Sequence, residues 1–140
     1  MRASISILIA ALTFVACSGP TAEGTFLVKS ASISGNCSGS NEVTWTFRRL
    51  DDGAAYALEI PSVQGGCKLS TVDGDESRLA RRCSITLSDG LVPGNVTGML
   101  DYDLVFTNDG FAGTVAVEMP PSKSAPGGCK GVNRLVGQRR

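Results

Sequence analysis

The sequence predicts an all-β domain in which about eight antiparallel strands form an up-and-down barrel, with a two-sheet β-sandwich as the alternative. Three observations lead to this prediction. Short runs of alternating apolar and polar residues recur along the chain. Turn residues separate these runs roughly every ten positions, a spacing typical of sandwiches and barrels. Four cysteines lie in or beside the runs, where they can join neighbouring strands.

The strands of the first half follow from alternation with a period of two residues. Residues 24–33 form the first predicted strand. Residues 43–47 and 56–60 alternate on the two sides of Asp51-Asp52-Gly53, a turn sequence, so they predict a hairpin. Residues 66–72 predict the fourth strand.

The second half continues the pattern. Residues 78–87 predict a fifth strand because their apolar residues keep a period of two, although residues 76–82 also suit two helical turns. Residues 96–106 and 111–119 form the clearest hairpin, with an Asn-Asp-Gly turn between them. The stretch that begins at Cys129 and ends at Gly137 predicts the last strand.

Four residues of the clearest hairpin depart from simple alternation. Gly98 and Gly113 lie on its apolar face, where they predict bends or a close approach between backbones. Met99 and Val105 are exceptions that put apolar side chains on the polar face. The remaining outward residues are polar or small, so we expect one face of the hairpin to be buried and the other to be solvated.

The first 16 residues predict a secretory signal peptide. Arg2 precedes residues 3–16, which carry no charge and are too few to span a bilayer. The segment ends in Phe14-Val15-Ala16-Cys17, which resembles the lipobox of bacterial lipoproteins. The resemblance implies that Cys17 becomes a diacylated N-terminus, and that a Gram-negative bacterium sorts the protein to the outer membrane, because Ser18 rather than an aspartate follows the cysteine. There it would face the periplasm or the outside. The alternative is an ordinary signal-peptidase site.

This division leaves residues 17–23 as the lipidated cysteine and its tether, and residues 24–140 as a single β domain stapled by disulfides. Two acyl chains anchor a protein stably in a membrane, whereas one chain alone is marginal. The partner predicted by the lipobox is therefore the membrane itself, reached through the lipid.

The number of cysteines agrees with lipidation. If Cys17 carries lipid, Cys37, Cys67, Cys83 and Cys129 remain, and four cysteines allow three connectivities. Cys67 and Cys83 flank a predicted turn symmetrically, so we expect them to face each other across a hairpin. Cys37 follows the first strand and Cys129 begins the last, and a closed barrel makes those strands neighbours. We therefore expect Cys37–Cys129 as the second bridge.

Gly24-Thr25-Phe26 at the start of the first strand, with a disulfide from that strand to the last, resembles the lipocalins. The resemblance implies an up-and-down barrel that carries a small apolar ligand. It also implies that an arginine, either Arg134 or Arg139, covers residue 26. The chain departs from the family in having Phe26 in place of tryptophan and in lacking a helix after the last strand.

Five aromatic residues predict either the lining of an apolar ligand cavity or a solid core, because the interior of an eight-stranded barrel has room for either. They are Trp45, Phe47, Tyr56, Tyr102 and Phe106.

Three groups of charged residues offer alternative sites. Asp73-Gly74-Asp75-Glu76 can supply oxygen ligands for calcium, but it suits a solvated turn better. Asp101 and Asp103 share one strand face, as paired acids or as part of a polar face. Five arginines form either an anion site or ordinary surface charge: Arg48, Arg49, Arg78, Arg81 and Arg82.

Composition excludes several functions. The chain has no histidine, which removes Ser-His-Asp and Cys-His nucleophiles and histidine-ligated zinc. Its 13 basic and 13 acidic residues balance without a basic cluster, which argues against nucleic acid. No cofactor or metal is predicted. We expect a non-enzymatic, membrane-anchored binding or envelope-structural module; a carrier of a small apolar ligand and an enzyme that works without histidine are the alternatives.

Overall fold

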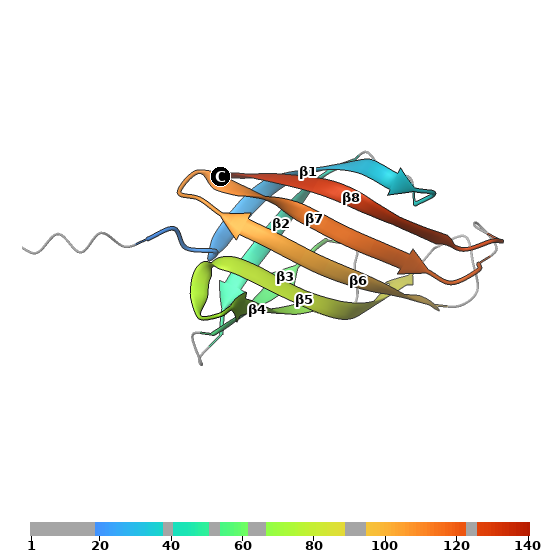
Figure 1. The fold of residues 1–140 in the computed structure, drawn as a ribbon, viewed down its shortest axis with the longest axis horizontal. Coiled ribbons are helices and arrows are strands. Elements are labelled where there is room, and N and C mark those ends of the chain that lie inside the picture. Colours follow the sequence, from blue (N-terminus) through green and yellow to red (C-terminus); the bar gives the residue numbers. More distant parts are fainter. Residues whose placement is uncertain (1–18, 38–40, 51–53, 62–66, 89–94, 123–125) are drawn as a thin grey trace, which may run out of the picture.

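The computed structural model describes residues 19–37, 41–50, 54–61, 67–88, 95–122 and 126–140. The strands are β1 (Gly24–Gly35), β2 (Asn41–Arg49), β3 (Ala55–Glu59), β4 (Cys67–Val72), β5 (Asp75–Ser88), β6 (Asn95–Phe106), β7 (Gly110–Met119) and β8 (Cys129–Arg139). Each strand pairs antiparallel with the next along the chain, and β1 also pairs with β8, which closes the barrel (Figure 1). The predicted up-and-down barrel is confirmed, and the two-sheet sandwich is wrong.

The barrel has two different ends. At the tether end, residues 19–23 enter β1 and the chain finishes at Arg140, on the left of Figure 1. The ends of β1, β3, β5 and β7 and the starts of β2, β4, β6 and β8 lie at the opposite end, which we call the far end. The predicted turn at Asp51-Asp52-Gly53 lies outside the described residues, but β2 and β3 pair as that turn requires.

Both predicted disulfides are present. Cys37 and Cys129 join the end of β1 to the start of β8 at the far end, with their Cα atoms 4.9 Å apart. Cys67 on β4 and Cys83 on β5 are joined with a Cα separation of 5.6 Å. The first bridge locks the seam that closes the barrel, and the second locks the β4–β5 hairpin.

The β4–β5 hairpin has a local cause. Asp73 and Gly74, which form its turn, have φ angles of 52° and 76°, both in the left-handed region. An Asp-Gly step tolerates this conformation, and turns with two such residues match the twist of paired strands. Residues 76–82, which also suited a helix, belong to β5.

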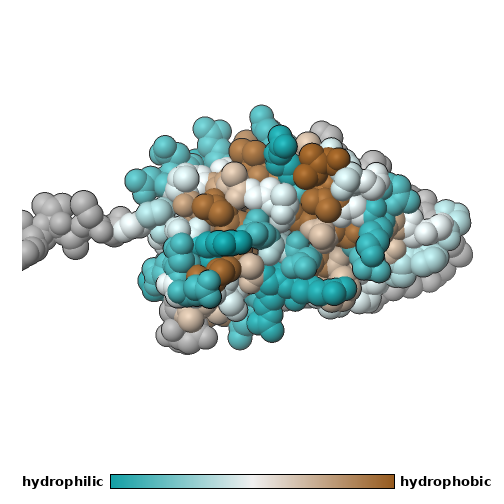
Figure 2. Space-filling model, in the orientation of Figure 1, coloured by the Kyte–Doolittle hydropathy of each residue, from teal (hydrophilic) through white to brown (hydrophobic). Residues whose placement is uncertain are grey.

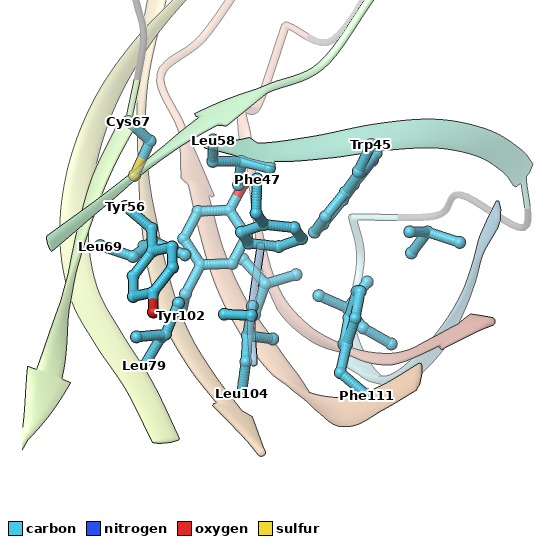
Figure 3. Packing of buried hydrophobic residues seen from close by; sticks show 14 of the residues in the cluster. Trp45, Phe47, Tyr56, Leu58, Cys67, Leu69, Leu79, Tyr102, Leu104 and Phe111 are labelled. Carbon is cyan, nitrogen blue, oxygen red and sulfur yellow. The ribbon is translucent and has the colours of Figure 1, made fainter. Parts of the chain in front are cut away.

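Aromatic rings fill the barrel interior. All five aromatic residues of the predicted cavity or core belong to one buried cluster. The ring centroids of Phe47 and Phe106 are 5.2 Å apart, and those of Trp45 and Tyr102 are 5.9 Å apart. Figure 3 shows Trp45, Phe47 and Tyr102 among the side chains that enter the interior from different strands of the barrel. These contacts pack the aromatic rings against one another within the buried cluster.

One core residue carries an unsatisfied polar group. Tyr56 is fully buried, and its hydroxyl has no hydrogen-bond partner among the described residues. An unpaired buried hydroxyl destabilises a fold by about 1–3 kcal/mol. The buried ring of Tyr56 therefore stabilises the core, whereas its unpaired hydroxyl destabilises the fold.

Glycine permits the predicted close approach between strands. A Cβ atom at Gly113 on β7 would collide with the backbone carbonyl oxygen of Asp103 on β6. At Gly98 it would collide with the sulfur of Met119. Packing against backbone therefore requires glycine at position 113, whereas at position 98 the flexible Met119 side chain would have to move.

Candidate functional site

Arg139 closes the tether end of the barrel. Its guanidinium carbon lies 4.7 Å from the centroid of the Phe26 ring, in a cation–π contact. The same group donates hydrogen bonds to the carbonyl oxygens of Thr21 at 2.6 Å, Glu23 at 2.7 Å and Asn108 at 3.2 Å. One side chain therefore connects the incoming chain, the first strand and the β6–β7 turn.

The register of the barrel decides which arginine covers residue 26. Arg139 stands directly opposite Phe26 in the pairing of β1 with β8, whereas Arg134 stands opposite Ala31. Ala22 is completely buried and belongs to the core cluster. The last part of the segment expected to be a tether is therefore held against the barrel, with its carbonyl groups bound by Arg139.

A second feature is the outer wall, by which we mean the outward-facing side chains of β6, β7, β8 and β1. Figure 2 shows brown apolar side chains on this face, interrupted by teal polar ones. Val105 on β6 and Val136 on β8 are 48% and 50% exposed. Both stand opposite Ala112 of β7, so an apolar row crosses the wall.

This apolar row lies in a shallow hollow of about 520 Å³, which Leu27 and Lys29 of β1 also line. A second hollow of about 410 Å³ lies nearer the far end. Its apolar part includes Met99, Ala116 and Val132, and its charged part consists of Arg82, Asp101, Glu118 and Lys130.

A polar row separates the two apolar parts of the wall. Asp103, Thr114 and Arg134 stand next to one another on β6, β7 and β8. The Asp103 carboxylate accepts hydrogen bonds of 3.1 and 3.0 Å from Arg78, and this raises the pKa of the Arg78 guanidinium. The wall thus combines exposed apolar area with charge of both signs.

Among the residues that the structure describes, the charged groups singled out in the sequence do not converge on an anion or metal site. Arg48 forms an ion pair with Glu59, and Arg49 forms one with Glu76, so each of these arginines has its own carboxylate partner. Arg78 and Arg82 pair with Asp103 and Glu118, whereas Arg81 is exposed.

The acidic turn is also locally satisfied. The Asp75 carboxylate accepts hydrogen bonds from the Ser77 hydroxyl at 2.6 Å and the Ser77 amide at 2.8 Å. These bonds lower the pKa of the Asp75 carboxyl. Within the described ranges, no group of three or more acidic or cysteine side chains is arranged to hold a metal ion.

The alternation of apolar and polar residues in the sequence indicated part of the outer wall. Met99 and Val105, the two exceptions to the polar face of the β6–β7 hairpin, both lie in the hollows of the wall. Val132 and Val136 complete the wall from β8. Their alignment with β6 depends on the registers of three strands, which the pattern of a single strand does not contain.

Comparison of the sequence with models of known protein families finds no match, and comparison with curated proteins finds no significant match. The part of the chain that the structure describes has no helix long and apolar enough to cross a membrane. The fold and the site define a closed eight-stranded barrel, stapled by two disulfides, with an arginine clamp at one end and a partly apolar outer wall.

Proposed function

We propose that this protein is a lipid-anchored, non-enzymatic module of a bacterial cell envelope, attached to the outer membrane through Cys17 and acting as a binding or envelope-structural domain. The observation that carries the proposal is the pairing of cysteines. All four cysteines of the β domain form disulfides with one another, which leaves Cys17 without a partner in the domain. Disulfides persist in oxidising compartments such as the periplasm and the cell surface.

The arginine clamp supports a defined orientation for such an anchor. Thr21 is the first residue that Arg139 holds, and only three residues separate it from Cys17. An extended chain spans at most about 3.6 Å per residue, so the lipid would lie within about 14 Å of Thr21. The tether end would then face the membrane, and the far end and the outer wall would remain accessible.

The packed core argues against a carrier of an apolar ligand. Of the five aromatic residues expected to line a cavity, four pack ring against ring and Tyr56 belongs to the same buried cluster. Nor does the outer wall favour an enzyme. Asp101 lies in the same hollow as Arg82, but the Arg82, Glu118 and Lys130 side chains there are 61%, 55% and 80% exposed. Catalytic electrostatics depends on groups shielded from water, whereas exposed mixed charge suits contact with another surface.

Metabolic labelling with palmitate tests the anchor. The full chain produced in a bacterium should incorporate the label and sediment with membranes. Cys17→Ala should abolish labelling, because the thiol that forms the thioether is gone, whereas the neighbouring Ser18→Ala variant should be labelled normally. Palmitate incorporation that persists in Cys17→Ala would refute the anchor.

A further inference from the structure

Two neighbouring rows of the outer wall have matching residues on the two sides of β7, whereas the next row towards the far end has Asp101 on β6 and Val132 on β8. Val105 on β6 and Val136 on β8 both stand opposite Ala112. Their exposed fractions, 48% and 50%, are almost equal. The apolar row therefore has a small residue at its centre and one half-exposed valine on each side.

In the neighbouring row, the residues at the two matching positions carry charges of opposite sign. Asp103 and Arg134 both stand opposite Thr114 of β7. Asp103 is paired with Arg78, whereas Arg134 forms no ion pair with a carboxylate of the described residues. An anion and a cation thus lie at equivalent positions on the two sides of the same strand.

We propose that the outer wall binds a second copy of this chain about a two-fold axis that runs parallel to β7 and passes over Ala112 and Thr114. Such a rotation brings β6 of each copy against β8 of the other. Val105 then meets the second copy's Val136, and Asp103 meets its Arg134. Each contact occurs twice, as an isologous interface requires.

The physical gain has two parts. Contact removes Val105 and Val136 from water, and the small side chains of Ala112 and Thr114 let the two walls approach closely. Arg134 gains a carboxylate partner without leaving another charge unpaired. Rotation about an axis parallel to β7 also leaves the tether ends of both copies on the same side, as two copies anchored in one membrane need.

Site-specific photo-crosslinking of the full chain tests the dimer. Two copies with different epitope tags are produced in the same bacterial cells, and a photoreactive phenylalanine analogue replaces Thr114 in one of them. Light should produce an adduct of twice the chain mass that carries both tags. The analogue at Lys68, an exposed residue of β4 outside the wall, is the matched control and should yield no two-tag adduct.

A charge exchange then tests the contact itself. Arg134→Asp in both copies should reduce the two-tag adduct about tenfold, because it replaces attraction with repulsion at two symmetric positions. Lys68→Asp, a charge reversal on β4, should leave the yield unchanged. Adding Asp103→Arg to Arg134→Asp should restore part of the adduct, since the two charges have exchanged places although Arg78 loses its carboxylate partner.

Mobility on non-reducing gels checks that every variant retains its disulfides and hence its fold. Absence of the two-tag adduct from folded chains would overturn the proposal. So would a two-tag adduct that Arg134→Asp leaves unchanged, or adducts formed only with other proteins. Because none of these measurements uses acylation as its readout, their failure is distinct from loss of palmitate labelling at Cys17.

Discussion

Replacing Arg139 with alanine should destabilise the barrel more than any other change to an arginine of β8. Arg139 makes a cation–π contact with Phe26 and donates three hydrogen bonds to backbone carbonyl groups at the tether end. Arg139→Ala removes all four interactions at once. It also frees the two residues on either side of Ala22, whose side chain is completely buried.

The magnitude follows from these contacts. A hydrogen bond contributes about 0.5–1.5 kcal/mol net, and a cation–π contact about 1 kcal/mol at a partly exposed site. Because Arg139 is only partly buried, we take the lower half of the hydrogen-bond range. Three hydrogen bonds and the ring contact then sum to about 3 kcal/mol of unfolding free energy, a large share of the 5–15 kcal/mol typical of a domain.

Urea unfolding with the disulfides intact measures this change. We expect the midpoint of Arg139→Ala to fall by roughly 1–2 M, given ordinary m-values for small proteins. Arg139→Lys should keep about a third of the stabilisation that Arg139 provides, since lysine keeps the charge but lacks the planar guanidinium. Hydrogen exchange should show increased exposure of residues 21–25 in both variants.

Arg134→Ala is the matched control. Arg134 lies on the same strand, is exposed, and makes no ion pair with the rest of the described chain. Its removal should change the monomer's stability by less than about 0.5 kcal/mol. The reasoning fails if Arg139→Ala costs no more than Arg134→Ala.

Four further predictions concern the core and the seam of the barrel. Replacing both Cys37 and Cys129 with alanine should lower the unfolding free energy by about 4–5 kcal/mol, since the bridge closes a loop with a sequence separation of 92; a loss below about 1 kcal/mol in calorimetry would contradict this. Gly113→Ala should cost about 2–4 kcal/mol, because its Cβ meets a backbone carbonyl that cannot move independently of β6; unchanged urea unfolding would be inconsistent with that collision. Tyr56→Phe should leave stability unchanged or raise it by about 1 kcal/mol, because it removes a hydroxyl without a partner in the described residues; a loss above about 1 kcal/mol would mean that the hydroxyl is satisfied. In the Tyr56→Phe variant Tyr102 is the only tyrosine, and burial raises the pKa of its phenol. The unfolded state therefore loses the phenol proton at a lower pH than the folded state, and the unfolding free energy should fall as the pH rises above about 10. Phenolate absorbance that appears near pH 10 before unfolding would refute the burial of Tyr102.

Local periodicity was sufficient to predict most of the barrel. The alternation of residues 96–106 and 111–119 predicted strands that the structure gives as Asn95–Phe106 and Gly110–Met119. A period of two residues is a property of the extended backbone itself, so it marks a strand and its two faces without reference to neighbours. The same reasoning placed Cys67 and Cys83 opposite each other across a hairpin, as they are.

The functional surfaces depended on contacts between distant segments. Arg134 and Arg139 both lie on β8, and only the pairing of β8 with β1 puts Arg139 rather than Arg134 opposite Phe26. Aromatic composition allowed either a cavity or a solid core, because the outcome depends on how well the side-chain volumes from several strands fill one enclosed space.

The sequence by itself determined the strands, the identity of their buried faces and the four cysteines that join them, since each of these is a local or pairwise property. Tertiary structure alone decided which side chains align across β6, β7 and β8 to form the outer wall, and which arginine binds the carbonyl groups of the entering chain. The physical reason is register: a shift of two residues in one strand keeps every buried side chain on the inside but changes all of its neighbours.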